Sequence, residues 1–369
     1  MKKILFISHN LGRTGSEMLL WYSLMNLNRE KFLPLLFTKS KGLLIDTLPH
    51  EIQHFLPYRE NPKRSLRILR SVLKKAKIDS LEYQLNYITK KHKVNIWYVN
   101  TIVLPEFYPI ANKLGVKIIT HVHELTFAYD FIGYNDLETI ITTSAAFIGC
   151  SKAVCSKISD MGRPDVKLLY GFIDIGKIIC TKTAAEVKAN TGFCDDDFVW
   201  AISGKTTLIK GIDFLVSLLP ELPENIKIIW IGGEENTGVY YYAKKAVENK
   251  HPERVKFLGA QSEEYYNYLN SADAFLLLSR EDSFPLVMLE AAALGKPIVG
   301  FNSGGIKEFV KEDTGIVIDT WRTKDLAEAM MEVKDHPERF NVDEIKRQAS
   351  LYEVKKQVSV LEDILDNIN

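Results

Sequence analysis

Short apolar runs alternate with polar and amphipathic segments along most of the chain. The first series of runs has four or five residues each, with predicted helices between most of them: 4–7, 33–37, 96–99, 116–120 and 145–149. Continuous apolar runs of this length are typical of strands that are buried on both faces of a parallel sheet. The alternation of strands and helices therefore predicts an α/β fold.

The same pattern occurs twice, on either side of a linker near residues 174–181. The second series of apolar runs comprises 198–202, 228–231, 255–259, 274–278 and 314–318. A chain of 369 residues is also too long for one typical core. We therefore predict two Rossmann-like doubly wound domains facing a cleft, residues 1–175 and 176–350, with a C-terminal helix in 351–369 that packs back towards the first domain. A single helix is expected over 341–367.

An acidic turn follows the apolar run 274–278 and leads into another predicted helix. Ser283 is a candidate N-cap, Pro285 falls in the first turn, and Gly295 stands just past the helix end. The free N–H groups and the dipole at such a helix start favour phosphate. Two carboxylates flank this start, Asp282 before the helix and Glu290 inside it, which indicates a nucleotide-linked substrate.

The loop 203–211 follows the first strand of the second domain and contains Gly204, Lys205 and Lys210. Its Gly-Lys-Thr-Thr resembles part of a P-loop, but Val199 stands where that motif requires a glycine. Two lysines five residues apart at a strand end are suited to binding a diphosphate. A solvent-exposed basic loop is the alternative.

Two features of the first domain are candidate ligand contacts. The loop 9–16 after the first strand contains Gly15, and it is either a plain βα turn or a site of close backbone approach to a ligand. His121 and His123 follow the strand 116–120, and residues two apart point the same way if the strand continues. A ligand-facing histidine, a structural pair and a metal site remain open for them.

Charge is balanced overall but is unevenly distributed. The chain has 47 basic and 47 acidic residues, whereas residues 59–93 contain eleven Lys or Arg and three acids, a local charge of 11 − 3 = +8. Within this segment, residues 63–77 form a basic amphipathic helix pattern. The helix either packs on its own sheet with a solvated charged face, or binds anionic lipid headgroups or an acidic acceptor. Nucleic acid is not expected as a partner.

Cysteine usage and hydropathy predict a cytoplasmic protein, with peripheral association at the inner face of the membrane as an alternative. The four cysteines show no metal-site spacing and no disulfide-scaffold density, so reduced thiols are expected. The apolar run at the N-terminus covers only residues 4–7, too short for a signal peptide. No apolar run reaches the length needed to span a bilayer.

Several segments together resemble the retaining glycosyltransferases of the GT-B fold, specifically the family 4 group. The segment SREDSFPLVMLEAAALGKPIVGF is similar to the donor-site segment of that family, and SGKTTLIKG to its phosphate loop. FISHNLGRTGSE resembles its first N-domain loop, and HVHELTFA the segment with its cleft histidine. The matches occur in family order over residues 4–334.

The resemblance implies a role for each matched residue. Glu290 would hold the ribose of the donor, and Asp282 would contact the donor sugar near the reacting carbon. Gly15 would let its loop close over the diphosphate, and His123, with His121 as the fallback, would be the cleft histidine. The remaining donor-binding residues would surround the diphosphate: Gly204, Lys205, Lys210, Ser283, Phe284, Pro285 and Leu286. Three departures are Asp282, where the family usually has Glu, Lys205, where Arg is frequent, and residues 170–174, where many members have an Asn-Gly turn.

The resemblance also implies the reaction. A hexosyltransferase-type enzyme would move a sugar from a UDP-, GDP- or ADP-sugar to a glycan or lipid-linked acceptor with retention of configuration, without a cofactor or metal. The alternatives are a sugar-nucleotide epimerase or a phosphorylase of the same fold, and a non-catalytic nucleotide-sugar-binding protein.

Overall fold

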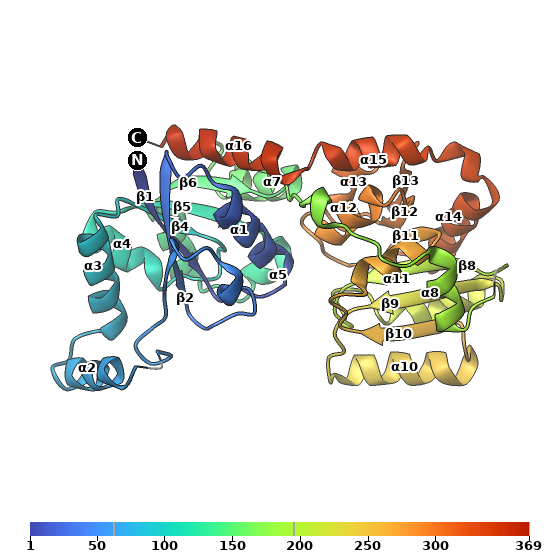
Figure 1. Cartoon of the computed structure of the whole chain (residues 1–369), viewed down its shortest axis with the longest axis horizontal. Coiled ribbons are helices and arrows are strands. Elements are labelled where there is room, and N and C mark those ends of the chain that lie inside the picture. Colours follow the sequence, from blue (N-terminus) through green and yellow to red (C-terminus); the bar gives the residue numbers. More distant parts are fainter. Residues whose placement is uncertain (62, 195, 369) are drawn as a thin grey trace. The chain divides into compact units, whose positions relative to one another are not determined.

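The computed structural model describes residues 1–61, 63–194 and 196–368. The chain forms two compact units: Met1–Gly171 together with Val354–Asn369, and Phe172–Glu353. Each unit is built around one parallel sheet with helices on both faces, so the predicted α/β class with two doubly wound domains is confirmed (Figure 1). Among the described residues, no helix is both long enough and apolar enough to cross a bilayer.

The sheet of the N-terminal unit pairs its strands in parallel throughout. In spatial order the strands are β3 (Gln53–Phe55), β2 (Phe32–Thr38), β1 (Lys2–Ser8), β4 (Ile96–Val99), β5 (Lys117–Val122), β6 (Ser144–Gly149) and β7 (Lys167–Leu168). The helices are α1 (Gly15–Asn26), α2 (Arg64–Lys75), α3 (Ser80–His92), α4 (Phe107–Leu114), α5 (Thr126–Tyr129), α6 (Tyr134–Thr143), α7 (Lys152–Asp160) and α16 (Val354–Asp366).

The sheet of the C-terminal unit is also parallel. Its spatial order is β10 (Val255–Gly259), β9 (Ile226–Ile231), β8 (Phe198–Ser203), β11 (Ala274–Leu277), β12 (Ile298–Phe301) and β13 (Gly315–Ile318). The helices are α8 (Ala184–Thr191), α9 (Phe214–Leu218), α10 (Gly238–Lys250), α11 (Tyr265–Ser271), α12 (Leu286–Ala293), α13 (Ile306–Phe309), α14 (Thr323–Asp335) and α15 (Val342–Ser350).

Strand order reverses once in each sheet, between β1 and β4 and between β8 and β11. Open parallel sheets bind ligands outside the carboxyl ends of the strands at such a reversal. Lys210 and Asp282 lie in the loops that follow β8 and β11, and Gly15 opens the helix that follows β1. The topology thus brings the predicted site residues of each unit to the carboxyl edge of its own sheet.

The single helix expected over 341–367 is wrong, because two helices, α15 and α16, occupy this stretch. Residues between them are held by strand-like contacts: the N–H of Ile173 donates to the carbonyl of Tyr352 at 3.1 Å, and Ile173 also pairs with Glu353. These bonds take up backbone groups that a continuous helix would need. The apolar spacing continues through the break, which is why the sequence pattern did not reveal it.

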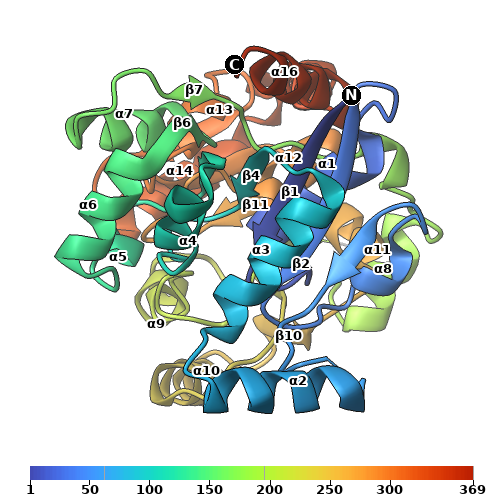
Figure 2. The ribbon, with the colours of Figure 1, turned by 90° about the vertical axis from the view of Figure 1, so that its left-hand side faces the viewer.

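Helix α16 belongs to the N-terminal unit, where it packs against α1. The ammonium group of Lys2 donates to the carbonyls of Leu365 and Asp366 at the end of α16, at 2.8 and 2.7 Å. Cations favour this end of a helix because the last carbonyls have no partner within it. Both chain ends consequently lie beside α16 at one end of this unit (Figure 2).

Other differences from the predicted elements concern short helices. The sequence pattern predicts a short helix over 42–48, but this segment forms only a 3₁₀ turn, Ile45–Thr47. The N–H of Leu44 is instead bonded to the carbonyl of Leu11 at 2.9 Å. The sequence pattern also missed α5, α6, α8 and α10. Helix α10 buries only Tyr240, Ala243 and Val247, so its apolar stripe is too narrow to stand out.

Candidate functional site

The acidic turn after β11 is the centre of the candidate site in the C-terminal unit. Helix α12 begins at Leu286, with Pro285 as the residue that precedes it, so the prediction of Ser283 as N-cap is wrong. A residue before proline avoids helical geometry, and Phe284 therefore cannot open the helix. Gly295 follows the helix end with a φ of +78°, as the sequence predicted.

The backbone of Asp282 is fixed by the loop that follows β12. Its N–H donates to the carbonyl of Ser303 at 2.8 Å, and its carbonyl accepts from the N–H of Gly305 at 3.1 Å. A Cβ on Gly305 would lie 2.2 Å from the carbonyl oxygen of Ser283, so only glycine permits this approach. The loop after β12 therefore sets the position of the acidic turn.

The carboxylate of Asp282 forms an ion pair with Lys210. The Lys210 Nζ lies 2.5 Å from Asp282 Oδ2, and Ser279 Oγ donates to the same oxygen at 3.3 Å. The Asp282 side chain is only 11% exposed, so water screens this pair weakly. Lys205 differs: it is 62% exposed and pairs with Glu235 at 3.1 Å. The structure thus brings Lys210, and not Lys205, to the acidic turn.

The loop that contains both lysines docks on the ends of two strands. The N–H of Gly204 donates to the carbonyl of Ile231 at 3.0 Å, and the Gly204 carbonyl accepts from the indole N–H of Trp230 at 2.8 Å. Gly211 has a φ of +76°, and a Cβ there would lie 2.2 Å from the carbonyl oxygen of Leu278. Lys210 is consequently held between two anchored glycines.

Glu290 is half-buried on α12 and accepts two phenolic hydrogen bonds. Tyr265 donates to its Oε2 at 2.9 Å and Tyr266 to its Oε1 at 3.1 Å. The hydroxyl of Tyr265 is also within 2.9 Å of Ser203 Oγ. Burial raises the pKa of Glu290 to about 7, and the two phenols partly offset this effect because they stabilise the carboxylate.

His121 and His123 form a contact pair at the end of β5, with ring centroids 3.9 Å apart. His121 is 3% exposed, and its Nδ1 lies 2.5 Å from the hydroxyl of buried Tyr98, as in a structural histidine. Among the described residues, no group of three or more His, Cys, Asp or Glu side chains could hold a metal ion. The structure therefore separates the two: His121 belongs to the core, while His123 is half-buried.

Asn100, at the end of β4, links His123 to the start of α1. Its Oδ1 lies 3.2 Å from His123 Nε2, and its Nδ2 donates to the carbonyl of Ser16 at 2.9 Å. Burial lowers the pKa of His123 to about 3, so the ring is neutral at pH 7 and can donate its Nε2–H to Asn100. Gly15 is the first residue of α1, so this network lies beside it.

Glu124 continues the same cluster. Its carboxylate accepts from the hydroxyl of Thr101, and from the N–H groups of His123 and Ile102 at 2.9 and 3.4 Å. Burial raises the pKa of Glu124, and these hydrogen bonds oppose the shift. The sequence pattern did not identify Asn100 and Glu124 as site residues. Asn100 directly follows the predicted strand 96–99, and Glu124 lies in the segment HVHELTFA, so their positions were the available signals.

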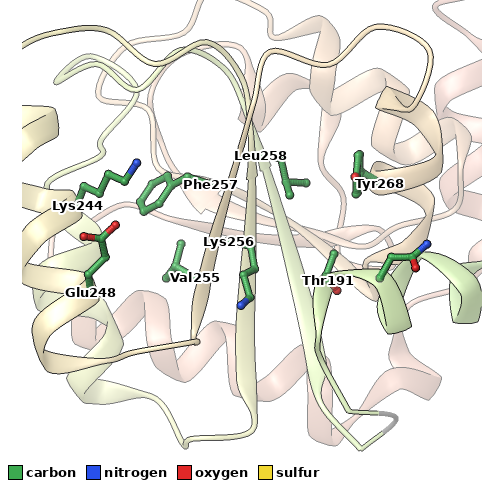
Figure 3. Close-up of a pocket in the computed structure, with 9 residues that line it drawn as sticks. Thr191, Lys244, Glu248, Val255, Lys256, Phe257, Leu258 and Tyr268 are labelled. Atoms are coloured by element: carbon green, nitrogen blue, oxygen red, sulfur yellow. The ribbon is translucent and has the colours of Figure 1, made fainter.

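A hollow of about 440 Å³ lies along the edge strand β10, between α8 and α10 (Figure 3). Thr191 and Tyr268 line one side of it, and Lys244 and Glu248 line the other. None of the predicted site residues lines this hollow. The candidate site is therefore defined by side-chain contacts at the carboxyl edge of the sheet, and not by this cavity.

The raised pKa of Glu290 predicts a pH-dependent contribution to stability. The folded chain keeps the Glu290 proton up to about pH 7, whereas an ordinary glutamate releases it near 4.5, so between these values the folded state binds more protons. The unfolding free energy contributed by this group therefore falls as pH rises through that window. Urea unfolding should show that the unfolding free energy of wild type, measured relative to that of Glu290→Gln, falls by roughly 1–3 kcal/mol from pH 5 to pH 8. Glu248→Gln, which alters an exposed glutamate, is the control. If the difference in unfolding free energy between wild type and Glu290→Gln is the same at both pH values, the raised pKa of Glu290 is contradicted.

Comparison with known proteins identifies the region that contains this site. The family model "Glycosyl transferases group 1" matches residues 184–351. An alpha-galactosylglucosyldiacylglycerol synthase of Streptococcus pneumoniae is 29% identical over 230 residues, 60% of this chain and 58% of the relative. An N-acetyl-alpha-D-glucosaminyl L-malate synthase of Bacillus anthracis is 28% identical over 249 residues, 64% of each chain. The matches thus span about six tenths of the length of these curated relatives.

Solved structures share the fold over the whole chain. Anabaena HepE in complex with UDP superposes with a TM-score of 0.83 at 18% identity, covering 99% of this chain and 100% of that one. Sucrose-phosphate synthase from Thermosynechococcus elongatus gives 0.80 at 15% identity, covering 100% and 99%. The chain therefore has the GT-B fold, and residues 184–351 of its C-terminal unit match the glycosyl transferases group 1 family.

Proposed function

We propose that this protein transfers a sugar from a nucleoside-diphosphate sugar to a glycan or lipid-linked acceptor, with retention of configuration. The observation that carries the proposal is the ion pair of Lys210 and Asp282 at the start of α12, within the family-matched region. The relatives support it by their names: one is a diacylglycerol glycoside synthase, and another, of Corynebacterium glutamicum, is a GDP-mannose-dependent mannosyltransferase. The solved HepE structures contain UDP and UDP-glucose.

The diphosphate of the donor would bind at the N-terminus of α12. The first-turn N–H groups of a helix have no partners within it, and the helix dipole favours an anion there. Ser283, Phe284 and Leu286 each carry a backbone N–H in this region, whereas Pro285 has none and can contribute only shape. Lys210, Lys205 and the close backbone of Gly204 would complete the diphosphate site.

The reaction requires cleavage of the bond between the anomeric carbon and the diphosphate. Negative charge builds on the leaving phosphate while an oxocarbenium-like centre forms on the sugar. Lys210 would turn from Asp282 to the phosphate, which leaves the Asp282 carboxylate free to face the developing positive charge. Charges carried on a fixed backbone contribute several kcal/mol in comparable sites, and Lys210 supplies positive charge that a metal would otherwise provide.

Glu290 and His123 are each suited to bind hydroxyl groups of the donor. A carboxylate has about four acceptor positions, so Glu290 can accept from Tyr265 and Tyr266 and still bind both ribose hydroxyls. His123 is kept neutral by burial and oriented by Asn100. A neutral imidazole with one nitrogen bonded to Asn100 keeps the other as an acceptor for a sugar hydroxyl.

The donor class is the first part of the proposal to test. A thermal-shift panel of UDP, GDP, ADP and their sugars should show stabilisation by one nucleotide class, since ligands that bind only the folded state raise its stability. Glu290→Gln should weaken that binding about tenfold in calorimetry, because the amide accepts fewer ribose hydrogen bonds. Wild-type affinity in this variant would show that the ribose assignment is wrong.

Removal of the Lys210 ammonium group should reduce catalysis far more than it reduces stability. We expect Lys210→Ala to lower kcat/KM at least 100-fold, by analogy with the loss of one charge-stabilising donor in other enzymes. Release of nucleoside diphosphate from the donor found in the panel measures this effect. Lys245→Ala, an exposed lysine on α10, serves as the control. Unchanged transfer by Lys210→Ala would contradict the phosphate role.

We further propose that α2 brings the protein to an anionic membrane surface. The helix buries Leu73, whereas the side chains of Ile68 and Val72 are both 56% exposed. These two apolar residues therefore do not pack in the core of the unit. Figures 1 and 2 both show α2 standing apart from the sheet, at the far end of α3. An exposed apolar pair flanked by Arg64 and Lys75 fits an interfacial helix better than a solvated face.

Vesicle binding tests this second proposal. The chain should bind vesicles that contain phosphatidylglycerol, and binding should fall as salt rises, because ions screen exposed charges. Reversing the basic residues to Glu should abolish it: Arg64, Arg67, Arg70, Lys74 and Lys77. Vesicles of phosphatidylcholine alone are the control. Binding that survives charge reversal would show that α2 does not carry it, whereas a wild-type chain that binds neither kind of vesicle would favour a soluble acceptor.

A further inference from the structure

Arg280, two residues before Asp282, directs all of its described hydrogen bonds to one segment. Its Nη1 and Nη2 donate to the two carboxylate oxygens of Asp213 at 2.7 and 2.6 Å. Nη1 also donates to the carbonyl of Leu208 at 2.7 Å, and the backbone N–H of Arg280 donates to the carbonyl of Ile209 at 2.8 Å. These partners belong to the lysine loop, or follow it directly.

This contact is a built junction and not a loose surface pair. The side chains of Arg280 and Asp213 are 35% and 30% exposed, and the guanidinium lies 4.1 Å from the ring centroid of Phe214. Phe214 in turn packs against Phe301, with ring centroids 4.9 Å apart. A planar guanidinium can form two parallel bonds to a carboxylate and stack on an aromatic ring, which an ammonium group cannot do.

The position of the junction matters because it lies beside the ion pair of the site. Ile209 directly precedes Lys210, and Arg280 is separated from Asp282 by one residue. The bonds of Arg280 to the lysine loop therefore determine where the backbone of Lys210 lies relative to the acidic turn. Lysine is a flexible side chain with many rotamers, so its charge is placed accurately only if its backbone is fixed.

We propose that Arg280 is a positioning residue that, through Asp213 and Leu208, holds the loop so that the Lys210 ammonium group meets the donor diphosphate. This inference rests on the proposed function, since it assumes that Lys210 binds phosphate. Arg280 acts through Lys210 and does not itself need to touch the donor. A purely structural junction would support the fold without a specific effect on phosphate binding, so the two roles can be separated.

Calorimetry on the full chain provides the test. UDP, GDP and ADP are titrated into wild type, and uridine, guanosine and adenosine serve as phosphate-free probes. We expect Arg280→Lys to weaken binding of the preferred nucleoside diphosphate about tenfold, and to leave binding of the matching nucleoside unchanged. Arg347→Lys, which alters an exposed Arg–Glu pair on α15, is the matched control and should bind as wild type. If Arg280→Lys does not fold, Asp213→Asn takes its place with the same expected result.

A double-mutant cycle with Lys210 separates positioning from a general effect. In a Lys210→Ala background, Arg280→Lys should weaken diphosphate binding less than twofold, because the group that it positions is gone. The same tenfold loss in both backgrounds, equal losses for diphosphate and nucleoside, or wild-type binding by Arg280→Lys would each overturn the inference. A wild-type chain that binds none of the three diphosphates would overturn the proposed function and the inference together.

Discussion

The ion pair of Lys210 and Asp282 depends on two loops that follow different strands of one sheet. Each partner stands after a strand beside the point where strand order reverses, β8 for the lysine and β11 for the acid. Neither loop is held by its own residues alone. Gly211 fits against Leu278, and the loop after β12 bonds both backbone groups of Asp282. The backbones that carry the two charges are therefore fixed by the sheet, so that only the Lys210 side chain has to move when it meets a phosphate.

The same arrangement explains why the acids of the site differ in their surroundings. Asp282 has a cation within 2.5 Å, which compensates for its burial. Glu290 has only neutral phenolic donors, so burial prevails and its pKa rises. One acid is thus suited to face a positive centre, and the other to accept hydrogen bonds from neutral hydroxyls. The related family more often has a glutamate at the position of Asp282. The shorter aspartate still reaches Lys210, because the loops that carry the two residues are in contact.

The sequence predicted the sheets well because buried parallel strands leave continuous apolar runs, such as 4–7 and 274–278. It predicted less about what depends on contacts between distant residues. The Tyr265–Glu290 and Asn100–His123 contacts join residues more than 20 positions apart, and no local pattern signals them. Helix α12 starts later than the preference of serine for helix caps predicts, because Pro285 keeps the residue before it out of helical geometry. The break between α15 and α16 was hidden by an apolar spacing that runs through it.

The anomeric configuration of the product tests the proposed sugar transfer most directly. Purified protein would be incubated with its preferred nucleoside-diphosphate sugar and a glycan or glycolipid acceptor, and the new linkage analysed by proton NMR. A retaining transferase forms a glycoside with the same anomeric configuration as the donor, together with one nucleoside diphosphate per linkage. An inverted product, or a donor that is consumed equally fast without any acceptor, would contradict the proposal.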